Sequence, residues 1–236
     1  MKGIELTDYL EGAGMPGVIR TWDEYARLAL TKKCYAPAHE LTYPLISLQT
    51  ELSELHEALQ KVVARVKHPF PGLNPQQCLP QVWAHAQEEL GDVLWAFTAL
   101  TWAMNWCHNK GKTELSFSSR ELQDFWNVKF AELENAALLD MTVHVCKLKT
   151  AVPVIYTQLN LVADRICRSL RMPEAGVEWL PCPAVNSNLL RIGKDLVKIT
   201  KALNTTLECT MNRQLSKMDD REKAGKFVVL TSIDTK

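Results

Sequence analysis

The sequence predicts an all-α fold on two observations. The 10 glycines and 11 prolines gather at a few breaks, and the long segments between them carry apolar residues at helical spacing. Stretches that alternate between apolar and polar residues, as a half-buried strand does, are scarce. The 236 residues are enough for one or two domains with a sizeable core.

The periodic segments predict where the helices lie. We expect helices over residues 21–33, 45–66, 80–108, 119–140, 187–203 and 206–223, with apolar spacing continuing less clearly from 140 to 170. Proline-rich loops are expected at 68–75 and 172–183, and a break at 109–112. Residues 227–230 are either a short terminal strand or a tail packed on the helices.

Charge and cysteine content exclude several classes of protein. The formal net charge is zero, so there is no general electrostatic reason to bind nucleic acid or an anionic membrane. The apolar stretch 93–106 is too short to span a bilayer. Seven cysteines, without a C-x-x-C pair or a recognisable signal peptide, indicate a reducing compartment. We therefore expect a cytoplasmic protein.

Two pairs of acidic residues stand at helical spacing. Glu51 and Glu54 lie inside the helix expected at 45–66, and Glu89 and Asp92 lie inside the one expected at 80–108. Residues three apart share a helix face, so each pair presents two carboxylates in one direction. Gly91 removes a side chain beside the second pair and allows another helix or a ligand to approach closely.

Antiparallel packing of these two helices would bring the four carboxylates together. Like charges oppose one another's ionisation, and a divalent cation relieves that cost. Oxygen ligands suit Mg²⁺, with Mn²⁺ as an alternative. Either motif alone is more typical of a solvated helix face. Because both pairs adjoin strongly apolar stretches, we favour the metal site.

The acidic motifs and their flanks resemble a known family. They read Leu48-x-x-Glu51-x-x-Glu54-Leu-x-Glu57-Ala and Glu88-Glu89-Leu-Gly-Asp92-Val-Leu-Trp. This combination resembles the signature of the MazG-like, all-α NTP pyrophosphohydrolases, a group that includes dCTPase-like and dUTPase-like enzymes. The resemblance covers about residues 18–108 and 206–227. Weaker support comes from Tyr25-Ala26, Thr31 and Tyr43-Pro44, and from a closing segment that has Gln214 where asparagine is common.

The resemblance implies an activity and a set of ligands. It implies hydrolysis of a nucleoside triphosphate, expected to be a deoxynucleotide, between the α- and β-phosphates, with a house-cleaning role in the nucleotide pool. Glu51, Glu54, Glu89 and Asp92 match the positions of the family's metal ligands. A carboxylate beside the metal, with Glu54 and Glu88 as the candidates, would accept the proton of the attacking water.

Further residues are candidates for binding the substrate. Lys217 and Arg221 are four apart on the last expected helix and would clamp phosphate oxygens, unless they pair with neighbouring acids on a solvated face. Tyr35 and His39 would hold the base, with ordinary loop packing as the alternative. Lys61, one to two turns after Glu54, is a candidate for contacting phosphate, although its position favours an ordinary surface lysine. Tryptophans 83, 95, 102 and 106 are expected in the core.

The chain is about twice the length that the resemblance requires. We expect a catalytic half, 1–138, with all the acidic ligands and therefore one active site per chain. The half 139–236 would be a degenerate repeat that completes a fused pseudo-dimer. A faint echo supports this, since Ile192-Gly-Lys-Asp195 is similar to Leu90-Gly-Asp92, and Lys147-Leu-Lys149 falls where an acidic pair would lie. The rival is one domain with a long helical insertion, and a homodimer is a further possibility for either.

Two functions of other classes remain open. A helical regulator or scaffold that binds nucleotide or metal without turnover would need the same residues. A ferritin-like di-metal oxidase is less favoured, because that site uses Glu-x-x-His pairs and neither acidic pair has a histidine at this spacing. No P-loop, dinucleotide-binding glycine pattern or Ser-His-Asp order is present.

Overall fold

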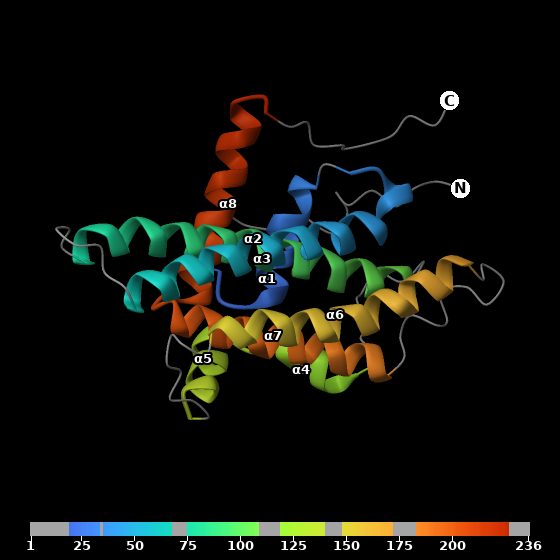
Figure 1. The fold of residues 1–236 in the computed structure, drawn as a ribbon. Helices are drawn as coiled ribbons and strands as arrows, with labels where there is room; N and C mark the ends of the chain where they lie inside the picture. The colour runs from blue at the N-terminus through green and yellow to red at the C-terminus, as the bar shows by residue number, and fades with distance from the viewer. Residues whose placement is uncertain are drawn as a thin grey trace.

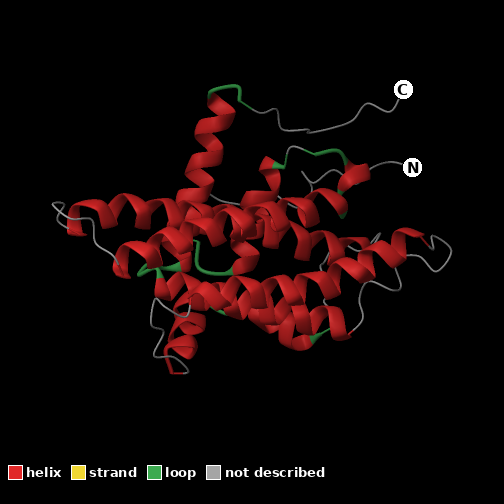
Figure 2. Ribbon diagram, in the orientation of Figure 1, coloured by secondary structure: helices red, strands yellow, loops and turns green. Residues whose placement is uncertain are grey.

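The computed structural model describes residues 19–33, 35–67, 75–108, 119–139, 148–171 and 183–226. Within these ranges the chain forms eight α-helices and two short 3-10 helices, and no strand (Figure 2). The all-α prediction is confirmed. None of the described helices has the length and apolar character that crossing a bilayer requires. The loops expected at 68–74 and 172–182, the break at 109–112, Lys147 and the segment 227–230 lie outside the described residues.

The first helix, α1 (Trp22–Ala29), begins at the N-cap expected from the sequence and continues into the 3-10 helix η2 (Leu30–Lys32). Thr21 and Glu24 form a reciprocal capping box, with the Thr21 hydroxyl accepting a hydrogen bond from the Glu24 amide at 3.2 Å. The Trp22 ring is fully buried, and its Nε1 donates to Thr98 Oγ1 at 2.8 Å. These bonds fix α1 against the centre of the molecule.

Helices α2 (Thr42–Lys67) and α3 (Pro75–His108) pack side by side and start earlier than expected. Pro44 lies in the first turn of α2, where a backbone amide has no intrahelical acceptor and proline is tolerated. Pro80 lies inside α3 and gives up one backbone hydrogen bond. The sequence prediction started both helices at or just after these prolines, whereas each helix begins before its proline. A second 3-10 helix, η3 (Pro37–His39), precedes α2.

The prediction of a single helix at 119–140 is wrong. Two helices take its place, α4 (Arg120–Asn127) and α5 (Phe130–Leu139), separated by Val128 in an extended conformation with ψ 139°. No glycine or proline marks this break in the sequence. The Phe130 amide donates to the carbonyl of Arg20 at 2.7 Å, so a tertiary hydrogen bond takes the amide out of the helical ladder.

A second pair of helices, α6 (Leu148–Arg171) and α7 (Pro183–Ala202), forms a layer beneath α2 and α3 (Figure 1). The Tyr156 hydroxyl on α6 donates to the Gln49 carbonyl on α2 at 2.8 Å and ties the layers together. Gly193 lets α7 lie directly on α4, because an added Cβ would come within 2.6 Å of the Phe125 ring.

The last described helix, α8 (Leu207–Lys223), stands at a steep angle to α2 and α3 and packs on α3 near Gly91, at the middle of that helix (Figure 1). Thr206 is its N-cap, and the buried Glu134 of α5 accepts a 2.6 Å hydrogen bond from the amide of Leu207. A carboxylate at a helix N-terminus satisfies a free amide and favours the helix dipole. The bond to Glu134 holds the start of α8 beside α5.

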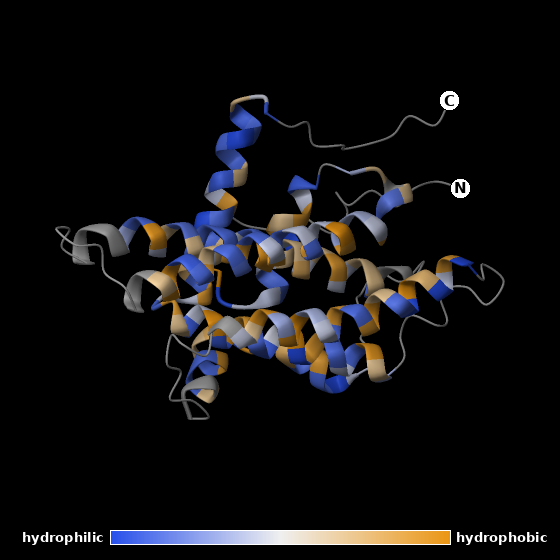
Figure 3. Cartoon of the chain, viewed as in Figure 1, coloured by the Kyte–Doolittle hydropathy of each residue, from blue (hydrophilic) through white to orange (hydrophobic). Residues whose placement is uncertain are grey.

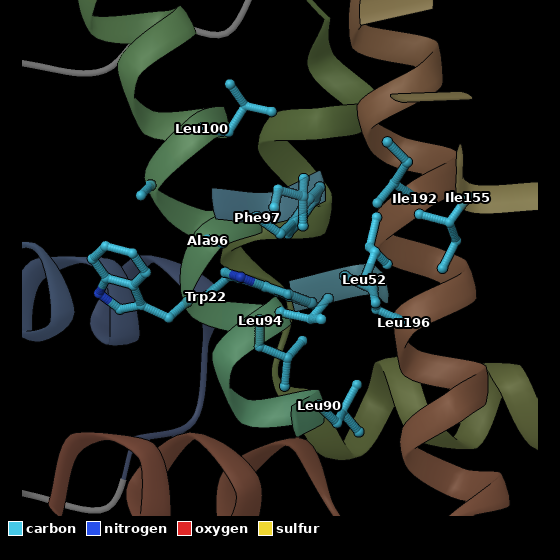
Figure 4. Close-up of a cluster of buried hydrophobic side chains, with 14 of the residues drawn as sticks. Trp22, Leu52, Leu90, Leu94, Ala96, Phe97, Leu100, Ile155, Ile192 and Leu196 are labelled. Atoms are coloured by element: carbon cyan, nitrogen blue, oxygen red, sulfur yellow. The ribbon is translucent and has the colours of Figure 1, made fainter. Parts of the chain in front are cut away.

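The core runs between the two layers. Figure 3 shows apolar positions on the faces that the helices turn toward one another, and Figure 4 shows side chains from α1, α2, α3, α6 and α7 meeting there. From Leu90 to Asn105 nearly every α3 side chain is buried, so α3 is apolar all round and forms the centre of the bundle. Trp95 and Trp102 are buried and Trp83 packs against the core, as expected, while the side chain of Trp106 lies outside the described residues.

Candidate metal centre

Three glutamates from two helices converge beside the core. Carboxylate oxygens of Glu51 and Glu54 on α2 and Glu89 on α3 all lie within 4.8 Å of one another. Glu51 and Glu89 are half-buried, while Glu54 is exposed to solvent. The antiparallel packing expected for these helices therefore brings together three of the four predicted metal ligands.

Apolar neighbours on each helix fix the direction of these carboxylates. Leu48, Leu52 and Leu55 are fully buried on α2, and Leu90 and Val93 are fully buried on α3. These side chains set the rotation of each helix about its axis, because the apolar stripe must face the core. The glutamates follow on the edge of that stripe and end between the helices at the boundary with water.

The fourth predicted ligand, Asp92, lies beside the group and is held by the last helix. Gln214 Nε2 donates to Asp92 Oδ1 at 2.7 Å, and the Lys217 ammonium forms an ion pair with Asp92 Oδ2. Lys217 was expected to meet phosphate or neighbouring acids, and here it neutralises a carboxylate of the candidate site. The lysine acts as an internal cation for the acidic cluster.

Gln214 is a site residue that the sequence did not single out for a role. Its side chain is buried and lies against Gly91, where an added Cβ would be 3.2 Å from Gln214 Oε1. The close approach that Gly91 was expected to permit is therefore made by α8. The position of Gln214 in the closing segment was the only signal in the sequence, and it did not reveal the partner.

His85 is a second residue that gains a place at the site. Its Nδ1 lies 3.3 Å from Glu89 Oε1, one turn earlier on α3. The i, i+4 spacing could have revealed this pair. A protonated imidazole favours the ionised form of a neighbouring carboxylate, so His85 in that form offsets part of the repulsion within the cluster.

Crowding of the carboxylates changes their protonation. Burial, followed by the charges of Asp92, Glu54 and Glu89, raises the pKa of Glu51 to about 7. Burial and Asp92 also raise the pKa of Glu89, against an opposing effect of His85. Without a cation Glu51 therefore keeps its proton to a higher pH than an ordinary glutamate, and a bound cation would remove the repulsion that contributes to this.

Tyr25 of α1 is an electrostatic neighbour of Asp92. The side chain is fully buried, and its hydroxyl has no hydrogen-bond partner among the residues that the structure describes. Burial, with a smaller contribution from the Asp92 carboxylate, raises the pKa of Tyr25, so the hydroxyl keeps its proton. No spacing rule connects Tyr25 to Asp92, since packing of α1 on α3 brings them together.

The residues present fit a hard divalent cation. The group offers oxygen ligands only, which is the chemistry that Mg²⁺ and Mn²⁺ prefer. Exposed Glu54 leaves one side of the group open to water, as a cation that retains water ligands requires. The unpartnered Tyr25 hydroxyl is a spare donor in the electrostatic neighbourhood of Asp92. Glu51, Glu54, Glu89 and Asp92 are the residues that would hold the ion.

The other predicted site residues lie in different surroundings. Glu88 is exposed on α3 and does not belong to the group of three glutamates, and Lys61 is exposed on α2. Arg221 is exposed on α8, one turn beyond Lys217. Nearby, Lys32 pairs with Asp219 at 3.0 Å and also with Glu222, which joins η2 to α8.

The two residues proposed to hold a base differ in exposure. Tyr35 is buried and stacks on the Tyr43 ring with centroids 4.7 Å apart, and Lys33 lies over the Tyr35 ring. His39 is exposed at the end of η3. Of the two aromatic rings, Tyr43 is the more accessible, with 39% of its surface exposed.

The all-helical fold and the carboxylate group rest on the chain's own residues. Neither the models of protein families, nor the curated proteins, nor the solved structures yield a match to this chain.

Proposed function

We propose that this chain is a Mg²⁺-dependent nucleoside triphosphate pyrophosphohydrolase of the MazG-like type. It would convert a (d)NTP and water to a (d)NMP and pyrophosphate and so act on the nucleotide pool. One observation carries the proposal: Glu51, Glu54 and Glu89 place carboxylate oxygens within 4.8 Å of one another, with Asp92 beside them. These are the positions at which the family motif has its metal ligands.

The carboxylates have a direct task in this reaction. Glu51, Glu54, Glu89 and Asp92 bind Mg²⁺, with Mn²⁺ as a substitute, on the solvent-facing edge of the α2/α3 pair. Bound there, the ion neutralises triphosphate charge and lowers the pKa of a coordinated water. The apolar side chains behind the cluster, with Leu52 and Leu90 fully buried, keep the ligands in fixed directions.

Basic residues of α8 are suited to the phosphates. Lys217 already lies at the cluster, paired with Asp92, and its flexible ammonium can move from that carboxylate to a phosphate oxygen. Arg221 is exposed one turn farther along and would extend the clamp. Lys61 on α2 would make a more distant phosphate contact, and Tyr35 and His39 would lie toward the base.

The proton of the attacking water needs an acceptor. The water oxygen bonds to the α-phosphorus, the bond to the α–β bridging oxygen breaks, and pyrophosphate leaves with that oxygen. Glu54 is our first candidate for the acceptor, because it belongs to the cluster and is open to solvent. Glu88 is the second candidate, since it is exposed one residue before Glu89.

The second half of the chain supports a fused pseudo-dimer. Hairpin α6/α7 lies on hairpin α2/α3, and each pair carries one glycine at a helix contact, Gly91 and Gly193. Only the first pair carries the acidic cluster among the described residues. We propose that residues 139–236 complete the bundle and lend Lys217 and Arg221 to one site per chain. A fragment ending at residue 138 that stayed stable and fully active would contradict this.

The decisive assay measures pyrophosphate released from a panel of NTPs and dNTPs with Mg²⁺. We expect release from at least one dNTP, and loss of release with EDTA or in the Glu54→Gln variant. Glu57→Gln is the matched control, because Glu57 is exposed on the same helix outside the cluster and should be dispensable. Nucleotide or Mg²⁺ binding without release from any substrate would favour a regulator or scaffold and overturn the enzyme.

A further inference from the structure

We infer that Tyr25 is a positioning residue of the metal centre, whose hydroxyl donates a hydrogen bond to the Asp92 carboxylate in the cation-loaded protein. The inference rests on the proposed function only in assuming that the carboxylate group binds a divalent cation. It concerns a residue of α1, outside both acidic motifs. Tyr25 would act through Asp92 and would not touch the substrate.

The packing of α1 on α3 brings Tyr25 to this position. Two hydrogen bonds join the helices: Trp22 Nε1 to Thr98 Oγ1 at 2.8 Å, and Trp95 Nε1 to the Ala29 carbonyl at 3.5 Å. Tyr25 lies one turn after Trp22 and one turn before Ala29, on the same face of α1. Tyr25 therefore lies on the face of α1 that meets α3, and on α3 Asp92 precedes Trp95 by three residues.

The hydroxyl has no other evident task. It is fully buried and unpartnered among the described residues, a state that costs free energy and is rare for a buried donor. A phenylalanine would fill the same volume without that cost. The Asp92 charge acts on the Tyr25 hydroxyl, so the two groups are electrostatic neighbours.

Asp92 has room for a further donor. Each carboxylate oxygen accepts two hydrogen bonds, and Gln214 and Lys217 supply one each. When a cation and a triphosphate compete for Asp92 and Lys217, the carboxylate needs a donor that stays in place. Groups that orient metal ligands in this way raise metal affinity about 10- to 100-fold.

The test compares Tyr25→Phe with Tyr156→Phe in the full chain. Binding of Mn²⁺ is followed by electron paramagnetic resonance, which distinguishes free from bound ion, and thermal unfolding is measured in EDTA and with saturating Mn²⁺. Tyr156 is the matched control, because its hydroxyl bonds a backbone carbonyl on α2. We expect Tyr25→Phe to weaken Mn²⁺ binding about 10- to 100-fold and to unfold in EDTA at the wild-type temperature or above.

The control should behave in the opposite way. Tyr156→Phe loses a formed hydrogen bond, so it should unfold at a lower temperature in EDTA and bind Mn²⁺ with wild-type affinity. In an Asp92→Asn background, Tyr25→Phe should have no further effect on Mn²⁺ affinity, because its partner carboxylate is gone.

Each contrary outcome has its own meaning. Wild-type Mn²⁺ affinity in Tyr25→Phe overturns the positioning role and leaves the proposed function standing. Failure of Tyr25→Phe to fold in EDTA shows that the hydroxyl already serves the metal-free structure and also overturns the inference. Absence of Mn²⁺ binding by the wild-type chain overturns the metal centre together with the role of Tyr25.

Discussion

Gln214 Nε2 donates a 2.7 Å hydrogen bond to Asp92 Oδ1, joining residues that are 122 positions apart in the chain. The bond ties the last helix to the helix that carries half of the acidic cluster. Lys217, one turn later on α8, pairs with the other oxygen of the same carboxylate. Helix α8 is therefore part of the candidate site, and substitutions on α8 should alter the surroundings of the carboxylates.

Removal of the Gln214 amide should destabilise the metal-free protein. Gln214→Met keeps most of the side-chain volume against Gly91 but leaves Asp92 with one donor fewer, at a cost of about 1–3 kcal/mol. The free energy of unfolding in urea, measured in EDTA, checks this. Gln60→Met is the control, since Gln60 is exposed on α2. Equal effects of the two substitutions would show that the Gln214–Asp92 bond contributes nothing.

Neutralising one glutamate of the cluster should preserve or raise the stability of the metal-free protein and should weaken its binding of metal. Glu89→Gln removes a repelling charge, so the metal-free protein should unfold at a temperature equal to or above that of the wild type. Wild-type protein at a free Mg²⁺ concentration of about 100 times its dissociation constant should gain about 2.7 kcal/mol, and Glu89→Gln should lose most of that gain. Thermal unfolding with and without Mg²⁺ measures both. Glu57→Gln should retain the full Mg²⁺ effect.

The protonation of Glu51 should make stability fall as pH rises. Its carboxyl titrates at 4.5 in an ordinary setting and at about 7 in the folded, metal-free protein. Above pH 4.5 the unfolded chain therefore ionises first, and the folded state loses stability progressively until about pH 7. Glu51→Gln removes this pH-dependent loss of stability, so the variant should become progressively more stable than the wild type between pH 4.5 and about pH 7.

Urea unfolding in EDTA at pH 5 and pH 8 tests this expectation. A difference between Glu51→Gln and wild type that is the same at both pH values would contradict the raised pKa. Saturating Mg²⁺ should reverse the trend in the wild type, because the ion favours the ionised carboxylates.

The two helix-contact glycines should respond differently to alanine. In Gly193→Ala the new Cβ would lie 2.6 Å from the Phe125 ring, so α4 and α7 must separate, at a cost of about 1–3 kcal/mol. Better helix propensity offsets about 1 kcal/mol of this. In Gly91→Ala the nearest atom is the flexible end of Gln214 at 3.2 Å, so the loss should be smaller. Chemical unfolding of both variants gives the order, and a Gly193→Ala protein more stable than Gly91→Ala would reverse it.

Apolar periodicity predicted most of the helices but not the break at Val128. A helix is predicted from apolar residues three and four positions apart, and this spacing is visible in the sequence around Leu48 and Leu52. The bond from the Phe130 amide to the Arg20 carbonyl depends on how distant segments pack. The boundaries near Pro44 and Pro80 failed for different reasons: proline is tolerated in the first turn, which holds Pro44, and α3 continues through Pro80 at the loss of one backbone hydrogen bond.

For the candidate site, the two carboxylate pairs could be predicted from the sequence, because i, i+3 spacing puts Glu51 with Glu54 and Glu89 with Asp92 on shared helix faces. The groups that meet these carboxylates depend on how the helices pack. Gln214 and Lys217 reach Asp92 from α8, and Tyr25 reaches the same carboxylate's surroundings from α1. Local spacing fixes directions along one helix, whereas contacts between helices follow from burial of all their apolar faces at once.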